Sequence, residues 1–106
     1  CFFSSWSRSF NKYFSQIINI SEEYDKNNEF LLIAVQEKKP LIKKYITKRG
    51  IPIQVAMDKF GRTFKNFHGK SIPFLVVIDK EGIVTYTNDY LQDGFENDLI
   101  EKLQLN

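Results

Sequence analysis

The sequence predicts an α/β domain with a mixed central sheet of about five strands, flanked by helices on both faces. Residues 30–35 and 74–78 are apolar at every position, which is typical of strands that helices cover on both sides. Between them, apolar residues recur every three to four positions, the period of an amphipathic helix. A hairpin signal follows the second run. The resulting order β-α-β-α-β-α-β-β-α fits one domain, and 106 residues suffice for a single core.

The first half of the chain predicts two crossovers between parallel strands. Residues 1–4 read as a short buried strand. One long helix is expected to follow from Ser9, because its apolar stripe runs through Phe10, Tyr13, Phe14, Ile17, Ile20 and Tyr24. After the strand at 30–35, Pro40 suits the first turn of a helix, and Gly50 ends that helix as a C-terminal cap.

The next segments predict a sheet edge and a short helix. Residues 52–57 are expected to form an edge strand, because Pro52 cannot donate a ladder hydrogen bond. A short helix is then expected to carry three aromatic side chains on one side, before Gly69 stops it: Phe60, Phe64 and Phe67.

The last third predicts a hairpin and a closing helix. Residues 79–82 form a turn with Gly82 where positive φ is needed, and the turn joins 74–78 to a strand at 83–86. Asp93 and Glu96 have the spacing of a capping box, which predicts the start of the final helix.

Composition excludes several classes of function. The net charge is +2 and basic residues occur along the whole chain, so we expect no nucleic-acid partner. No apolar run approaches the roughly 20 residues of a membrane span, so membrane contact is expected only through an anchor outside this chain. One cysteine cannot form an intrachain disulfide, and we expect neither a metal nor a cofactor, since no ligand cluster or phosphate loop is present. The chain opens inside an apolar run, which predicts further residues upstream of its first strand.

Four segments carry a resemblance to a known family. Phe2-Phe3-Ser4-Ser5-Trp6 is similar to a strand that ends in Ala-Ser-Trp before a Cys-x-x-Cys motif, and 58–61 to an Asp-x-x-Gly turn. Residues 70–73 are similar to a segment that ends in a cis-proline, and 74–82 to a Thr-Phe-Leu-Ile-Asp-x-x-Gly hairpin. Together they resemble the thioredoxin-like superfamily, in its branch of TlpA/ResA-type thiol–disulfide oxidoreductases. The resemblance implies one thioredoxin-like domain over residues 1–106.

The two cysteine positions of the motif hold Ser7 and Phe10 in this chain. Disulfide exchange requires a thiolate and a second, resolving thiol. A serine hydroxyl is far less acidic than a thiol, and phenylalanine has no reactive group. We therefore interpret the loop as a vestigial active site without a catalytic residue, formed by Trp6, Ser7, Arg8, Ser9 and Phe10.

Another nucleophile scheme is not favoured. Ser7 would need a positioned base, and the resemblance does not bring His68, the single histidine, beside the loop. The simpler role for Ser7 or Ser9 is the N-cap of the first helix.

The resemblance also implies that the Ile72–Pro73 bond is cis and lies against the motif loop. In relatives the backbone beside this proline pairs with an extended substrate. Pro73 and Trp6 therefore either leave a shallow apolar peptide-binding groove or persist for folding alone.

The leading functional hypothesis is a redox-inactive thioredoxin-like domain that serves as a protein- or peptide-binding or structural module, with an unknown partner. The alternative is a divergent thiol–disulfide oxidoreductase, TlpA/ResA-like or peroxiredoxin-related, which uses a cysteine outside this chain or one altered at Ser7. An assembly domain of a larger complex would instead show a contiguous exposed apolar patch. Family habit implies an exported or periplasmic, membrane-tethered location.

Overall fold

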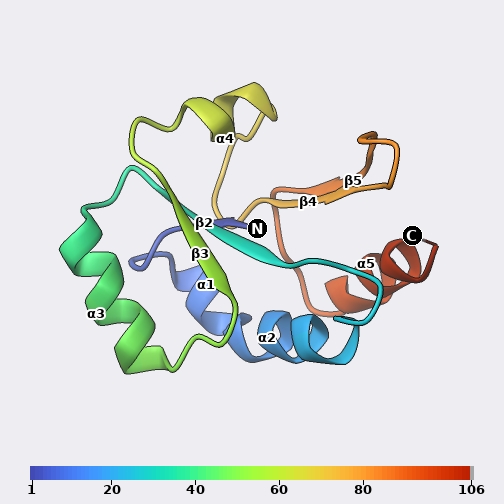
Figure 1. Cartoon of the computed structure of the whole chain (residues 1–106), viewed down its shortest axis with the longest axis horizontal. Helices are drawn as coiled ribbons and strands as arrows, with labels where there is room; N and C mark the ends of the chain where they lie inside the picture. Colours follow the sequence, from blue (N-terminus) through green and yellow to red (C-terminus); the bar gives the residue numbers. More distant parts are fainter. Residues whose placement is uncertain (106) are drawn as a thin grey trace.

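The computed structural model describes residues 1–105 and confirms the predicted α/β order, with the first predicted helix divided in two (Figure 1). The elements are β1 (Phe2–Phe3), α1 (Arg8–Lys12), α2 (Phe14–Glu23), β2 (Leu31–Val35), α3 (Lys39–Arg49), β3 (Gln54–Asp58), α4 (Arg62–Asn66), β4 (Leu75–Ile78), β5 (Val84–Asn88) and α5 (Phe95–Gln104). Within residues 1–105, none of the helices is both long and apolar enough to cross a membrane.

The strands form one mixed sheet with β1 at its centre. β1, β2 and β3 are parallel neighbours in that order, and β4 and β5 form an antiparallel hairpin. A single bridge joins the two parts: the Phe2 amide donates to the Phe74 carbonyl at 2.9 Å, and the Phe74 amide to the Phe2 carbonyl at 3.0 Å. The spatial order is therefore β3-β2-β1-β4-β5. As predicted, β3 is an edge strand and Gly82 adopts positive φ (82°) in the hairpin turn.

Helices cover the two faces of the sheet unequally. α1, α2 and α5 lie along one face and α4 lies on the other (Figure 1). The Phe3 and Tyr45 rings are 6.1 Å apart, which places α3 with the larger group. The main core forms under these helices, around Phe3, Phe10, Ile17, Leu32, Ala34, Ile42, Leu75, Leu99 and Leu103. A smaller cluster under α4 contains Phe2, Val35 and Phe74, packed against Phe64 and Phe67.

The apolar sequence of residues 74–78 predicted a strand that helices cover on both faces along its whole length, and this prediction was wrong. Ile78 at the end of β4 is exposed, as are Ile83 and Val84 across the turn. α4 has five residues and packs over Phe2 and Phe74 at the other end of β4, so it does not reach the hairpin tip.

The predicted long first helix breaks at Tyr13. This residue has φ −99° and ψ 11°, and it ends α1 and precedes α2. Its hydroxyl donates to Asp93 Oδ1 at 2.8 Å, and its ring meets the Phe95 ring edge-on with centroids 5.3 Å apart. Both contacts join the break to the start of α5. A period of three to four residues cannot indicate a contact with a residue 80 positions away.

Two further predictions were wrong. Phe60 does not share a face with Phe64 and Phe67: it is 66% exposed, because the left-handed turn at Gly61 (φ 71°) separates it from α4. The capping box at Asp93 does not form either. Gly94 (φ 90°) is the N-cap of α5 and no side chain caps it, while the Asp93 carboxylate accepts the Tyr13 hydroxyl instead.

Candidate functional site

Ser7 lies where the loop after β1 meets the segment before β4. It is the N-cap of α1, as predicted: its Oγ accepts the Phe10 amide at 3.1 Å. The same hydroxyl donates to the Ile72 carbonyl oxygen at 3.4 Å, across 65 residues of sequence. The Ile72–Pro73 peptide bond is cis. The Ser7 side chain is thus 96% buried between a helix terminus and the cis-proline segment, with backbone groups as its partners.

Phe10, in the second cysteine position, is a core residue. Its side chain is fully buried, with its ring centroid 4.8 Å from that of Phe3 and 5.8 Å from that of Phe14. The phenyl ring joins α1 and α2 to the centre of the sheet.

The loop after β1 meets the segment before β4 at a site that we call the Trp6–Pro73 edge and define as Trp6, Ser7, Arg8, Ile72 and Pro73. Its accessible surface comes from Trp6, Arg8 and part of Ile72, because Ser7 and Pro73 are buried. Trp6 is 72% exposed and Arg8 is also exposed. Ile72 is half-buried, and Pro73 is fully buried beneath it. A large aromatic ring that the fold leaves in solvent marks a candidate contact surface, because burying such a ring contributes strongly to interfaces.

A polar network holds the loop in place. Asn11 Nδ2 donates to the Ser5 carbonyl at 3.0 Å and to the Ser7 carbonyl at 2.8 Å, while Asn11 Oδ1 accepts the Tyr45 hydroxyl from α3 at 2.6 Å. The Ser5 amide donates to Glu37 Oε1 at 2.6 Å. Burial raises the pKa of the Tyr45 phenol, so it remains a neutral donor at ordinary pH. These four polar contacts therefore fix the loop before any partner arrives.

Sequence reasoning missed Asn11, Glu37 and Tyr45 as supports of the site. One signal was present for Asn11, since an asparagine inside a helical period often bonds nearby backbone carbonyls. No local sequence signal indicated the roles of Glu37 and Tyr45, because their hydrogen-bond partners lie more than 30 residues away in the chain.

Ser4 and His68 have no part in a catalytic arrangement. Ser4 is fully buried, and its Oγ has no hydrogen-bond partner among residues 1–105. His68 is exposed at the end of α4 with φ 62°, and the hydroxyl of Ser7 bonds backbone groups instead. In the same described part of the chain, no group of three or more His, Cys, Asp or Glu residues lies close enough to hold a metal ion.

Charge is divided between two halves of the molecule, which the small net charge conceals. Residues 36–73 hold ten of the 15 Lys and Arg but two of the 13 Asp and Glu, a net +8, and the rest of the chain carries −6. These residues include α3 and α4, which lie toward the opposite end of the molecule from the hairpin tip and α5 (Figure 1).

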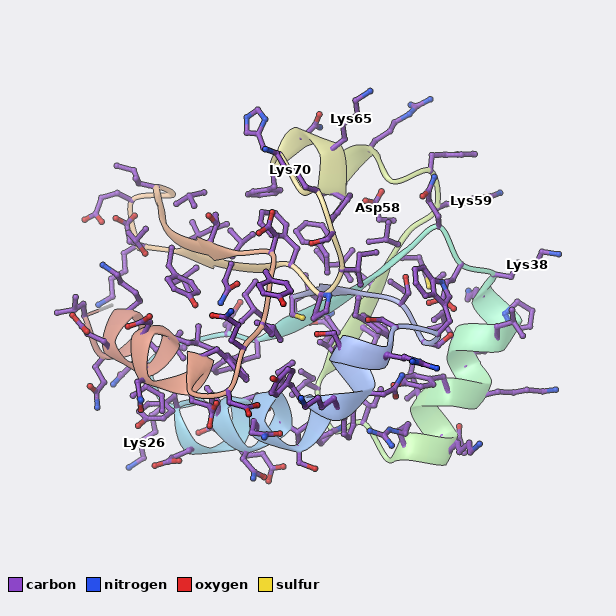
Figure 2. The ribbon with its side chains drawn as sticks, turned by 180° about the vertical axis from the view of Figure 1, so that it is seen from behind. Lys26, Lys38, Asp58, Lys59, Lys65 and Lys70 are labelled. Atoms are coloured by element: carbon purple, nitrogen blue, oxygen red, sulfur yellow. The ribbon has the colours of Figure 1, made fainter. Side chains whose placement is uncertain are left out.

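The basic side chains of this half form a rim that points to solvent. Figure 2 shows Lys38, Lys59, Lys65 and Lys70 extending from α4 and from nearby loops, and all four are exposed. Lys38 and Lys59 follow the carboxyl ends of β2 and β3, and the loop with Trp6 follows the same end of the parallel strand β1. We call these four lysines with Arg62 the basic rim. The two acidic side chains of residues 36–73 are turned inward. Glu37 accepts the Ser5 amide, and Asp58 is buried and accepts the amides of Thr63 and Phe64 at 3.3 and 2.8 Å.

Comparisons with known proteins agree with this geometry. The family model described as thioredoxin-like matches residues 1–84. No curated protein matches the chain by sequence. Among solved structures, the chain is similar to the pneumococcal exposed lipoprotein thioredoxin Etrx1 from Streptococcus pneumoniae, with 17% identity and a TM-score of 0.84 over 99% of this chain and 81% of that one. StoA from Bacillus subtilis matches with 13% identity and a TM-score of 0.79, over 97% and 78% of the two chains.

A thioredoxin-like protein from Porphyromonas gingivalis matches with 20% identity and a TM-score of 0.76, over 98% and 71%. At these identities the solved structures establish the fold alone, and the family rests on the match that covers most of the chain. With its five-stranded mixed sheet and a cis-proline beside the loop after β1, the chain belongs to the thioredoxin-like family.

Proposed function

We propose that this protein is a redox-inactive thioredoxin-like domain of the TlpA/ResA-type branch, which binds an extended acidic segment of a partner polypeptide at the Trp6–Pro73 edge. One observation carries the proposal: a hydroxyl, that of Ser7, bonds the carbonyl preceding cis-Pro73 in the place of the reactive thiol. The architecture of a redox site is present there without a group that can exchange disulfides.

The inactivity follows from the chemistry of both motif positions. Exchange forms a mixed disulfide on one thiolate and resolves it with a second thiol. Ser7 offers no thiolate and Phe10 is packed in the core. Cys1, the single cysteine, precedes β1, whereas the loop follows it, so the length of the strand separates the thiol from the Trp6–Pro73 edge.

Two features support a polypeptide partner. Trp6 provides an exposed ring beside an exposed cation, Arg8, on a loop that is already held by Asn11 and Glu37. A prearranged surface loses little conformational entropy on binding, which favours affinity.

The charge around the edge supports an acidic partner. The basic rim extends from α4 and from the loops after β2 and β3, while the two acidic side chains of residues 36–73 are engaged internally. Such a field accelerates encounter with segments of opposite charge and disfavours basic ones.

Trp6 makes the proposal testable by fluorescence, since it is the single tryptophan of the chain. The titrant is a capped eight-residue peptide that alternates glutamate and valine, with a lysine–valine peptide and a single-stranded oligonucleotide as comparisons. We expect the acidic peptide to change Trp6 emission, with affinity falling at least about fivefold between 50 and 500 mM NaCl. Equal response to the lysine peptide, or preference for the oligonucleotide, would contradict an acidic polypeptide partner.

A matched pair of variants locates the binding charge. Reversing Lys59, Arg62 and Lys65 to glutamate should weaken binding of the acidic peptide by at least about tenfold. Reversing Lys26, Lys80 and Lys102, which lie outside the basic half, changes net charge equally and should leave affinity within about twofold. The same loss in both variants would show that net charge, rather than the basic rim, attracts the peptide.

An insulin-reduction assay with dithiothreitol tests redox inactivity separately. The chain should give turbidity at the rate of the reagent alone. Turnover above that rate would favour the alternative, a divergent thiol–disulfide oxidoreductase.

A further inference from the structure

Phe60 is an exposed aromatic residue that the proposed function does not use. Its side chain is 66% exposed, compared with 72% for Trp6. Two members of the basic rim flank the ring, with Lys59 Nζ 5.4 Å and Arg62 Cζ 5.5 Å from its centroid. The ring and the two cations together offer apolar area and positive charge at one point, which suits a segment that carries both acidic and apolar side chains.

The turn that carries Phe60 is held by Asp58. The buried carboxylate of Asp58 accepts the amides of Thr63 and Phe64 at 3.3 and 2.8 Å. The carbonyl of the same residue accepts the Gly61 amide at 3.1 Å. Because the backbone on both sides of Phe60 is held before a partner arrives, a contact to the ring loses little backbone entropy, and this favours affinity.

The segment directly after β2 connects this turn to the loop that carries Trp6. The Gln36 amide donates to the Asp58 carbonyl at 2.9 Å, at the start of the turn. The next residue, Glu37, accepts the amide of Ser5 at 2.6 Å, and Ser5 precedes Trp6 in the chain. The two exposed rings therefore belong to loops that one short segment holds together.

The loops with Trp6 and Phe60 lie at the same edge of the sheet. Each follows the carboxyl end of a strand, and β1 and β3 are both parallel to β2, which lies between them. Neighbouring strands are about 4.8 Å apart, so the ends of β1 and β3 are about 10 Å apart, a distance that about three residues of an extended chain span. A segment bound at the Trp6–Pro73 edge therefore needs few further residues to reach Phe60.

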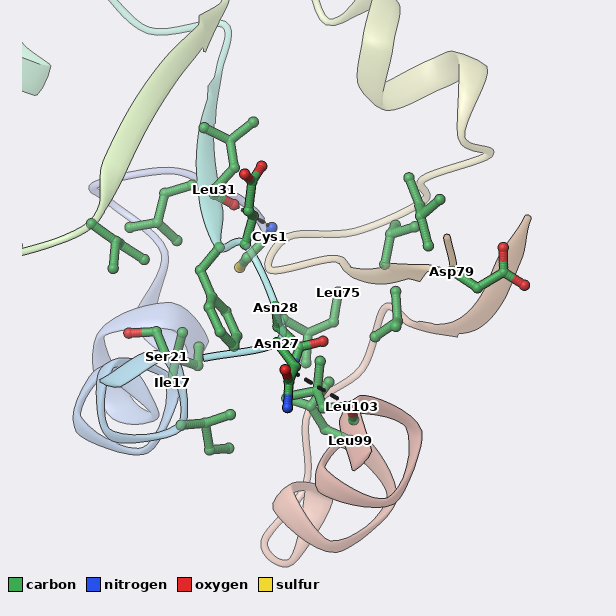
Figure 3. A pocket seen from close by; sticks show the side chains of 18 of the residues that line it. Cys1, Ile17, Ser21, Asn27, Asn28, Leu31, Leu75, Asp79, Leu99 and Leu103 are labelled. Carbon is green, nitrogen blue, oxygen red and sulfur yellow. Dashed lines mark hydrogen bonds between the residues drawn. The ribbon is translucent and has the colours of Figure 1, made fainter. Parts of the chain in front are cut away.

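A mainly apolar cavity of about 420 Å³ lies at the other end of the sheet (Figure 3). Leu31, the first residue of β2, lines it, whereas the loop with Trp6 follows the carboxyl end of the neighbouring parallel strand. The charged residues of its lining are two acidic and one basic: Glu29, Asp79 and Lys80. Because this cavity has no excess of positive charge, it suits an acidic segment less well than the turn with Phe60 does.

We propose that Phe60 is a second anchor for the acidic partner segment. The segment runs from the Trp6–Pro73 edge across the end of β2 and lays an apolar side chain on the Phe60 ring, while its carboxylates pair with Lys59 and Arg62. This inference rests on the proposed function, because it concerns the same segment beyond its contact with Trp6. It requires acidic and apolar side chains in one stretch of the partner, since carboxylates alone would leave the ring without a contact.

Isothermal titration calorimetry with two peptides tests the role of the ring. The first is the glutamate–valine octapeptide, and the second replaces each valine with serine, which keeps the length and the charge. Phe60→Ala should weaken binding of the valine peptide by at least about fivefold and binding of the serine peptide by less than about twofold. Phe60→Tyr keeps an aromatic ring and should bind the valine peptide within about twofold of the original chain.

Ile83→Ala is the matched control. It removes an apolar side chain that is 60% exposed at the hairpin tip, away from the basic rim. Affinity for the valine peptide should stay within about twofold of that of the original chain. All three variants keep the net charge, so a change in affinity cannot come from a change in the number of cations.

Several results would overturn the inference. Equal affinity of Phe60→Ala and the original chain for the valine peptide would exclude the second anchor while binding at the Trp6–Pro73 edge stands. An equal loss for both peptides, or an equal loss in Ile83→Ala, would show that the ring makes no specific apolar contact. If the valine peptide binds without changing Trp6 emission and Phe60→Ala abolishes that binding, the turn is a separate site and the segment does not continue from the edge. No binding of the valine peptide to the original chain would contradict the proposed function and this inference together.

Discussion

Replacing Phe10 with alanine tests whether this residue, which the sequence analysis assigned to the second cysteine position, is part of the core. The ring is fully buried and packs against Phe3 at 4.8 Å and edge-on against Phe14 at 5.8 Å. Truncating a buried phenylalanine typically costs about 3–5 kcal/mol, which includes the cavity left behind. A domain of this size has a free energy of unfolding of about 5–15 kcal/mol. The substitution should therefore remove a third or more of the stability in most of that range.

The assay is urea unfolding followed by circular dichroism, with the free energy extrapolated to zero urea. The matched control is Phe60→Ala, because the Phe60 ring is 66% exposed and contacts the cations of Lys59 and Arg62 instead of the core. That variant should lose less than about 1 kcal/mol. A loss below about 1 kcal/mol for Phe10→Ala as well would refute the assignment of Phe10 to the core.

Three further predictions concern single groups around the fold. Ser4→Ala should leave the free energy of unfolding in urea unchanged or raise it by up to about 2 kcal/mol, because the buried hydroxyl has no partner among residues 1–105. A clear decrease in that free energy would reveal an interaction of the hydroxyl. Gly69→Ala should lower the free energy of unfolding by about 1–3 kcal/mol, because the new Cβ would lie 2.3 Å from the Phe64 ring. An unchanged free energy of unfolding would mean that the ring moves aside freely. The hydrogen bond to Asp93 raises the pKa of the Tyr13 phenol above its unfolded value of about 10. The bond therefore stabilises the fold fully below about pH 10 and is lost as pH rises through the raised pKa. The Tm difference between the original chain and Tyr13→Phe should shrink between pH 9 and 12, and a constant difference would contradict the bond.

Local signals predicted much of this fold. Gly50 and Ser7 cap their helices as expected, and Gly82 forms the hairpin turn, because each role depends on the conformation of one residue and its near neighbours. The apolar runs likewise identified the strands, although not how far the helices cover them.

Contacts between distant segments account for the errors. The break at Tyr13 and the role of Asp93 come from one hydrogen bond across 80 residues. The support of the candidate site by Glu37 and Tyr45 likewise depends on the packing of α3 and its preceding loop against the motif loop. The net charge did not predict the basic rim, because +2 is the sum of +8 in one half of the molecule and −6 in the other.

Nuclear magnetic resonance tests most directly whether the Trp6–Pro73 edge is a binding surface. Amide shifts of the 106-residue chain would be followed during titration with the glutamate–valine peptide. The account predicts saturable shifts that concentrate on Trp6, Arg8 and Ile72 and spread to the basic rim, with the β4–β5 hairpin unaffected. Shifts confined to the hairpin, or none at millimolar peptide, would contradict it.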